Sequence, residues 1–185
     1  YNTLTDRWKK PLNVWTLETH IVNVCMALKY EAISNNIVGE EYKDRAQALY
    51  DILKRYNGTP AGIFTGDECL SGLSPIQGSE LCSVVELMYS YEILYAYTGD
   101  KKWAERLEVV AFNALPAAIS DDMWTHQYDQ MSNQIACQRF GKPIFRTNFH
   151  DAHLFGLEPN FGCCTANFNQ GWPKFTLSAF MHNDN

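Results

Sequence analysis

Two short segments of the sequence carry residues that could hold a metal ion. The first contains Glu80 and Cys82, and the second contains the adjacent pair Cys163 and Cys164. Together they offer three thiols and one carboxylate, which is the donor set of a tetrahedral zinc site. On a regular helix, side chains two positions apart point about 200° away from each other. Glu80 and Cys82 can therefore share one ion only at the start of a helix, where Glu80 is not yet helical.

The same residues also have a simpler interpretation. Cys82 is then a small buried side chain, Glu80 is a charge in the first turn of a helix, and the cysteine pair fills a turn in the core. The six cysteines favour reduced thiols over disulfides, because a chain of 185 residues is neither small nor dense in cysteine. Spacing alone leaves both interpretations open.

The spacing of apolar side chains shows which elements must position these residues. Apolar residues three and four apart predict helices over residues 14–35, 40–56, 79–97 and 101–118. Gly99 is suited to end the third of these helices and Asp100 to cap the fourth. A last helix is predicted over 165–180, where Gly171 and Pro173 should break or kink it.

Two stretches, residues 57–78 and 119–162, are predicted to be irregular. The first holds five of the eleven glycines together with two prolines, which is typical of a loop. The second is aromatic, rich in Asn and Gln, and leaves room for short strands; a long irregular segment in a compact domain usually serves function. Helices paired through short loops predict an all-α fold of the α/α barrel or toroid type.

Length and charge limit the classes of protein to consider. The 185 residues make one domain, 1–185, or a fragment of a larger one, and both ends resemble cuts through a longer chain, so the rest of a parent polypeptide is expected. A net charge of −6 argues against nucleic acid or an anionic membrane as a partner. No apolar run approaches the roughly 18 residues of a membrane span. Acidic charge and reduced thiols favour a cytoplasmic setting, although the compartment itself stays open.

Taken in order, these motifs resemble glycoside hydrolase family 127, the β-L-arabinofuranosidases and their relatives of the former DUF1680 group. The resemblance runs from about Trp15 to Phe175 and implies part of an (α/α)6 catalytic barrel. It is carried by His20-Ile-Val-Asn23, Gly66-Asp67-Glu68, Glu80-Leu-Cys82, Tyr97-Thr-Gly-Asp100 with Val110–Pro116, and Gly162-Cys-Cys-Thr-Ala-Asn167.

The resemblance implies a retaining glycosidase whose nucleophile is a zinc-held cysteine, whereas most glycosidases use two carboxylates. Carried over residue by residue, it implies a Zn²⁺ site formed by Glu80, Cys82, Cys163 and Cys164. Cys163 would attack the anomeric carbon. Glu68 would protonate the leaving oxygen and then deprotonate water, and His20 would hydrogen-bond a sugar hydroxyl.

Two departures from the better-known branch of that family predict a divergent branch. Phe161 and Thr165 stand where that branch has the first Cys and the Pro of its Cys-x-Cys-Cys-Pro motif. The gap from Glu68 to Glu80 is 12 residues, shorter than in that branch, so Asp67 is a rival for the acid/base role. The substrate need not be β-L-arabinofuranose.

Other residues have both a functional and a structural interpretation. Tyr128, Asp129 and Gln130 could line a sugar site, since amides pair well with hydroxyls, or form a polar turn. Phe161 could stack on a sugar ring or pack in the core. The spacing of His150 and His153 could hold a second metal, although a hydrogen-bonded loop is the commoner outcome.

Two functions of other classes also fit the sequence. One is a zinc lyase that activates substrate thiols, as lanthionine cyclases do; their ligands include a His beside a Cys, and no Cys-His dipeptide occurs here. The other is a non-catalytic carbohydrate-binding or scaffolding α-toroid domain with a structural zinc, because a closed four-ligand site is structural by default.

Overall fold

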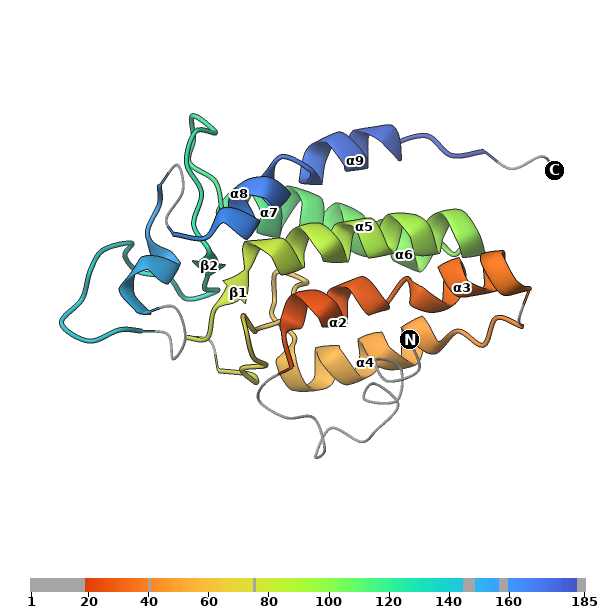
Figure 1. Cartoon of the computed structure of the whole chain (residues 1–185), viewed down its shortest axis with the longest axis horizontal. Helices are drawn as coiled ribbons and strands as arrows, with labels where there is room; N and C mark the ends of the chain where they lie inside the picture. Colours follow the sequence, from red (N-terminus) through yellow and green to blue (C-terminus); the bar gives the residue numbers. More distant parts are fainter. Residues whose placement is uncertain (1–18, 40, 75, 145–148, 157–159, 183–185) are drawn as a thin grey trace.

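The computed structural model describes residues 19–39, 41–74, 76–144, 149–156 and 160–182, and most of its regular structure is helical. Figure 1 shows the longer helices side by side along the length of the molecule, with α5 in the middle. The helices are α2 (Ile21–Ala27), α3 (Tyr30–Val38), α4 (Arg45–Asn57), α5 (Leu81–Thr98), α6 (Lys101–Val109), α7 (Leu115–Ala117), α8 (Gly162–Phe168) and α9 (Gly171–Leu177). The predicted all-α fold is confirmed. Within the described part, no helix has the length and apolar character needed to cross a membrane.

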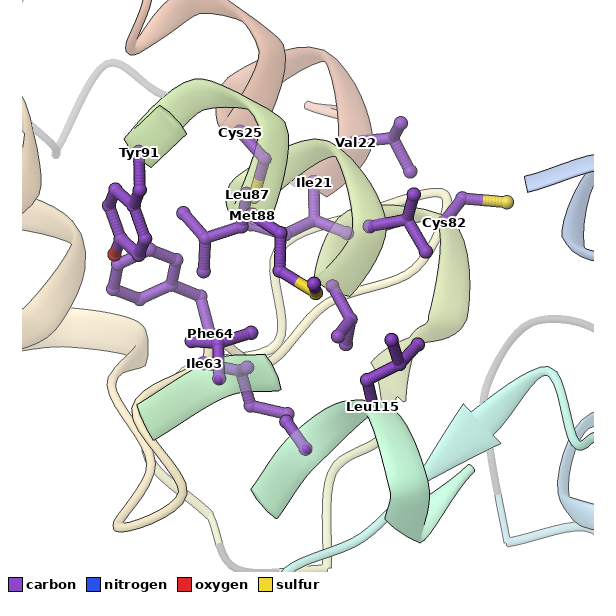
Figure 2. Packing of buried hydrophobic residues seen from close by; sticks show 14 of the residues in the cluster. Ile21, Val22, Cys25, Ile63, Phe64, Cys82, Leu87, Met88, Tyr91 and Leu115 are labelled. Atoms are coloured by element: carbon purple, nitrogen blue, oxygen red, sulfur yellow. The ribbon is translucent and has the colours of Figure 1, made fainter. Parts of the chain in front are cut away.

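α5 is the central element because its sequence is apolar around most of its circumference, which is typical of a buried helix. It packs against α2, α6, α8 and α9. Figure 2 shows the core that results, with residues of α5 meeting residues of α2, α7 and the loop after α4: Leu87, Met88, Tyr91, Ile21, Val22, Cys25, Leu115, Ile63 and Phe64. Because α5 is packed against helices on several sides, the position of its first turn is fixed as well.

The first turn of α5 follows directly on a short strand, β1 (Ser79–Glu80). β1 pairs antiparallel with β2 (Asp129–Gln130), so that Glu80 lies opposite Asp129. Glu80 therefore has an extended backbone, with φ −66° and ψ 136°, whereas Cys82 already belongs to the helix. The expectation that Glu80 is not yet helical while Cys82 is helical is confirmed, and α5 begins at Leu81 rather than at residue 79.

The prediction of one helix over 14–35 is partly wrong. Residues 14–18 lie outside the described part, and the helix begins only at Ile21 and is interrupted at Leu28–Lys29. The Ser90 hydroxyl on α5 donates to the Cys25 carbonyl at 2.6 Å, and this carbonyl would accept from the Lys29 amide in a continuous helix. The Cys25 carbonyl is therefore bonded to α5, at the point where the helix of its own segment is interrupted.

The predicted helix over 40–56 begins late, at Arg45, and ends at Asn57. Residue 40 lies outside the described part. The buried carboxylate of Glu31 accepts from the backbone amides of Lys43 and Arg45, at 2.8 and 2.7 Å. A carboxylate from α3 therefore satisfies the donors before the helix, and the chain turns there through Asp44, whose φ is 52°.

The predicted helix over 101–118 is confirmed as α6, a π turn η2 (Val110–Ala114) and α7 in succession. Gly99 ends α5 with a φ of 67°, and the Asp100 side chain caps α6 by accepting from the Lys102 amide, as expected. The widened turn comes just before Pro116, which lacks an N–H and clashes with the carbonyl four residues earlier in a regular helix.

The predicted last helix is in fact two helices, α8 and α9, separated at Asn169–Gln170. The break beside Gly171 is confirmed. A Cβ on Gly171 would lie 2.7 Å from Leu115 Cδ2, so glycine permits α9 to approach α7. The start at 165 is wrong: α8 begins at Gly162, which puts the Cys163–Cys164 pair in its first turn.

The two stretches predicted to be irregular are confirmed as such. Residues 57–78 and the described part of 119–162 hold only short elements, namely isolated bridges, β2 and one 3-10 turn, η3 (Phe149–His153). Figure 1 shows the second stretch gathered at one end of the helices, at the end where α5 and α8 begin.

Glu92 on α5 provides a test of the packing far from this end. Its carboxyl is buried; Oε2 accepts from the Ser178 hydroxyl at 2.9 Å, and Oε1 has no hydrogen-bond partner within the described residues. Burial raises the pKa of this carboxyl. We expect Glu92→Gln to raise the free energy of unfolding by about 1 kcal/mol at pH 7, because the buried charge is removed.

The gain should depend on pH in one direction. The unfolded chain releases the Glu92 proton near pH 4.3, below the raised pKa in the folded chain. The wild type therefore loses stability relative to Glu92→Gln as the pH rises above that value. Thermal unfolding at pH 4.5, 5.5 and 7 measures this, with the exposed Glu108→Gln as control. A variant less stable than wild type at pH 7 would contradict the expectation.

Candidate active site and metal centre

The first turns of α5 and α8 bring together the four residues with metal-ligating side chains. The ligand atoms of Glu80, Cys82, Cys163 and Cys164 all lie within 4.8 Å of one another. The Sγ atoms of Cys82 and Cys164, 82 residues apart in the chain, are 3.2 Å apart. A metal ion needs at least three His, Cys, Asp or Glu side chains close together, and within the described residues these four side chains meet that requirement. We refer to them as the thiol cluster.

The chemistry of the thiol cluster fits a soft divalent metal ion. Burial raises the pKa of the Cys163 thiol to about 11. The pKa of Cys164 is raised further, first by its hydrogen bond to Cys82 and then by burial. Without a cation, such thiols keep their protons at neutral pH. Three sulfurs and one oxygen at this spacing suit zinc, which stabilises thiolates.

Exposure distinguishes one member of the thiol cluster from the rest. Glu80, Cys82 and Cys164 are at most 1% exposed, whereas Cys163 is exposed to solvent. The three buried side chains can hold an ion, but a dissolved molecule can reach only Cys163. The cluster is therefore open on one side.

His20 lies at the oxygen end of the thiol cluster, just before α2. Its Nε2 donates to Glu80 Oε2 at 2.8 Å and lies 3.8 Å from Glu68 Oε2. The hydrogen bond with Glu80 raises the pKa of His20, against the opposing effect of burial. His20 thus connects the carboxylate of the cluster with the second carboxylate that the sequence singled out.

Glu68 is exposed, and a buried tyrosine holds one of its oxygens. The Tyr128 hydroxyl donates to Glu68 Oε1 at 3.2 Å, and the Tyr128 side chain has no exposed surface. The Tyr128 carbonyl accepts from the Leu81 amide at 2.8 Å, at the start of α5. The tyrosine that contacts Glu68 is therefore fixed to the same helix start as the thiol cluster.

The loop that carries Asp67 and Glu68 is pinned at several points. The Glu80 amide donates to the Gly66 carbonyl, and the Ile21 amide donates to the Asp67 carbonyl, both at 3.0 Å. Gly66 has a φ of 150°, and a Cβ there would lie 2.9 Å from the Cβ of Ile21. Only glycine allows this close approach of the loop to α2.

Asp67, the rival of Glu68, faces the interior. It is 5% exposed, and its Oδ1 accepts from the Cys69 amide at 3.1 Å. Burial raises the pKa of the Asp67 carboxyl, although the bonds from Cys69 oppose this. Of the two neighbouring acids, Glu68 is therefore the one that an external molecule can reach.

The structure gives Gln130 and Asp129 buried positions. The Gln130 amide nitrogen donates to the Ala114 carbonyl at 2.7 Å and ties β2 to η2. Asp129 has no exposed surface, and neither of its oxygens has a hydrogen-bond partner within the described part. Burial raises its pKa, reinforced by Asp67, Glu80 and Glu68. The sequence grouped Asp129 with surface residues of a sugar site, whereas the ladder to Glu80 places it inside.

The pair His150 and His153 does not join a metal-binding group within the described residues. His153 is buried, its Nε2 lies 2.6 Å from the Gln138 carbonyl, and its ring stacks on Phe140. This corresponds to the hydrogen-bonded loop that the sequence favoured. His126 instead contacts α8, with Nε2 3.1 Å from the Thr165 hydroxyl.

Two contacts of the site were missed by sequence reasoning. The bond between His20 and Glu80 joins residues 60 positions apart. The rings of Tyr128 and Phe161 stack with centroids 4.0 Å apart, so the partner of Phe161 is a tyrosine of the protein itself. No local pattern signals either contact, because neither follows a helical or strand period.

The described part is thus mostly helical and places a thiol cluster with one exposed member near an exposed carboxylate, Glu68. Comparison with protein families then gives the class. Residues 63–177, more than half of the chain, match the model of the β-L-arabinofuranosidase, GH127 catalytic domain. The chain belongs to glycoside hydrolase family 127. No curated protein and no solved structure matches it.

This membership confirms the family resemblance and the class of enzyme, a glycoside hydrolase with a carbohydrate substrate. The all-α, toroid-type fold agrees with it, and the described helices form part of such a toroid. The matched segment contains Glu68, Tyr128 and the whole thiol cluster, while His20 lies before it.

Proposed function

We propose that this chain is catalytic in a retaining glycoside hydrolase that acts on β-L-arabinofuranosides or a related sugar. Cys163 is the nucleophile, held in a zinc site, and Glu68 is the acid/base. The observation that carries the proposal is the exposure of Cys163 alone within the otherwise buried thiol cluster. A structural metal site gains nothing from one exposed ligand, whereas a nucleophile must be reached by substrate.

The residues that would hold the metal are Glu80, Cys82, Cys163 and Cys164. A bound zinc ion would keep the ligating thiols deprotonated at neutral pH, which the raised pKa values of Cys163 and Cys164 otherwise prevent for those two. His20 donates to the Glu80 carboxylate and so fixes its orientation, as hydrogen-bonded outer residues do at metal sites generally.

In the first step, the Cys163 sulfur attacks the anomeric carbon and forms a C–S bond as the glycosidic C–O bond breaks. The leaving oxygen takes a proton from Glu68. In the second step, the Glu68 carboxylate takes a proton from water, the water oxygen attacks the same carbon, and the C–S bond breaks to regenerate the thiolate. Two inversions give net retention of configuration, as with a carboxylate nucleophile.

Tyr128 and Gln130 support the sugar site through contacts with other residues of the protein. The Tyr128 hydroxyl donates to Glu68 and supports its ionised form between the two steps. Gln130 holds β2 in place through Ala114. We place the sugar hydroxyls beside His20, whose Nε2 contacts both Glu80 and Glu68.

A structural zinc site in a non-catalytic carbohydrate-binding domain is the second candidate. It is favoured by one observation, the complete set of four donors, which leaves no ligand position for water. The zinc lyase alternative has less support, because no histidine belongs to the thiol cluster. Covalent trapping separates the first two candidates.

The test combines metal content with trapping. We expect about one zinc per wild-type chain, and the same in Cys137→Ser, a cysteine outside the cluster. Glu80→Gln and Cys82→Ser should lose most of it. An L-arabinofuranose derivative with a thiol-reactive group at the anomeric position should then modify Cys163, read by peptide mass spectrometry. Zinc-free wild type, or an adduct only on Cys137, would overturn the proposal.

A further inference from the structure

The rings of Tyr128 and Phe161 form a stacked pair that joins a residue bonded to Glu68 with a residue close to Cys163 in the chain. Their centroids lie 4.0 Å apart and their planes differ by 19°. Tyr128 comes just before β2, and Phe161 comes just before α8. Aromatic pairs favour particular relative orientations because of the charge distribution of their rings, so each ring restrains the other. We refer to this pair as the aromatic stack.

One side of the aromatic stack leads to Glu68. The Tyr128 hydroxyl donates to Glu68 Oε1 at 3.2 Å. The tyrosine is fully buried, and its carbonyl is bound by the first amide of α5. Its ring can therefore shift only if its neighbours move, and one neighbour is the ring of Phe161.

The other side of the aromatic stack leads to Cys163. The Phe161 carbonyl accepts from the amides of Cys164 and Thr165, at 3.0 and 3.3 Å, and so closes the first turn of α8. Asn160, just before it, has a φ of 63°, and its side chain donates to Asp151 at 2.9 Å. The backbone is thus sharply turned at Asn160, and the place of the Phe161 ring is linked to the place of Cys163 two residues later.

We propose that Phe161 is a positioning residue, which through the aromatic stack on Tyr128 sets the place of Glu68 relative to Cys163. The inference rests on the proposed function, since it needs Glu68 as the acid/base. In this role Phe161 acts through the ring of Tyr128 rather than through a contact with substrate or the reacting atoms. Loss of its ring should impair proton transfer to the leaving group more than it impairs the attack of the sulfur.

Leaving-group dependence separates this role from a merely structural one. A dinitrophenolate leaves without a proton, whereas an alkoxide needs one, so an acid that is misplaced matters only for the second. The experiment compares kcat/KM of the metal-loaded protein on dinitrophenyl and alkyl L-arabinofuranosides. In Phe161→Leu, we expect a loss of about 10- to 100-fold on the alkyl substrate and under about threefold on the dinitrophenyl substrate. Phe161→Tyr, which keeps the ring, should match wild type on both.

Two further variants connect the effect to Glu68. Tyr128→Phe keeps the stacked ring but removes the hydroxyl, and should show the same leaving-group dependence even if Phe161→Leu folds poorly. In a Glu68→Gln background, Phe161→Leu should cause no additional loss, because both changes act on one proton transfer.

The outcomes distinguish this inference from the proposed function. If Glu68→Gln is leaving-group dependent but Phe161→Leu slows both substrates equally, or slows neither, Phe161 has no positioning role and the proposed function stands. If Glu68→Gln slows both substrates equally, the acid/base assignment fails, and the inference fails with it. Zinc content of each variant shows that the thiol cluster is retained in the comparison.

Discussion

Replacing Cys163 with alanine is expected to abolish hydrolysis, by at least about 1,000-fold in kcat, while the chain stays folded. The substitution removes the one sulfur of the thiol cluster that substrate can reach. Alanine cannot form the glycosyl intermediate, and no other thiol of the cluster is exposed to replace it. The hydrophobic core is untouched, so thermal unfolding of the zinc-free variant should differ little from that of zinc-free wild type.

The matched control is Cys164→Ser, which alters the buried neighbour in the same turn. Cys164 lies 3.2 Å from Cys82, sulfur to sulfur, and is inaccessible to substrate. We expect this variant to lose both zinc and activity. Cys163→Ala should keep part of its zinc through the three buried ligands while losing all activity. The measurements are the rate of hydrolysis, the zinc content and the labelling by the thiol-reactive sugar, each on wild type, Cys163→Ala and Cys164→Ser. Full activity in Cys163→Ala would exclude it as the nucleophile.

Replacing Glu68 with glutamine is expected to lower kcat/KM on alkyl glycosides by about 100- to 10,000-fold, because the proton donor to the leaving oxygen is lost. The loss on a dinitrophenyl glycoside should be much smaller. Glutamine keeps the size of the side chain, and its amide oxygen can still accept from the Tyr128 hydroxyl. The local structure should therefore be preserved.

Asp67→Asn separates the two neighbouring acids. Asp67 is buried and accepts from the backbone and thiol of Cys69, so its replacement should change stability rather than leaving-group dependence. Azide provides a second measurement, since it can attack the glycosyl intermediate without help from a base. It should restore turnover of the dinitrophenyl substrate in Glu68→Gln and not in Asp67→Asn. The reverse pattern would move the acid/base role to Asp67.

Local geometry explains which features could be predicted from the sequence. Glu80 and Cys82 can share an ion only at a helix start, and the chain does change there from extended to helical backbone. The end of α5 at Gly99 and the break beside Gly171 follow from what glycine permits at single positions. Each of these depends on a few neighbouring residues, which is why spacing and residue type were sufficient.

Helix boundaries set by distant residues could not be predicted in this way. α4 begins at Arg45, where Glu31 on another helix accepts from the amides of Lys43 and Arg45. α2 is interrupted where Ser90 of α5 takes the Cys25 carbonyl. The apolar periodicity continues through both places, so it contains no sign of either contact.

The sequence by itself determined the family, the helical class and the list of side chains able to bind a metal, because these are properties of residue type and order. Only the tertiary structure decided their accessibility: that Cys163 is exposed and Cys164 buried, that Asp67 faces inward and Glu68 outward. The sequence does not show which of two neighbouring thiols, or of two neighbouring carboxylates, is accessible to solvent. Their accessibility is set by the packing of α8 and of the loop at Gly66 against the first turns of α5 and α2.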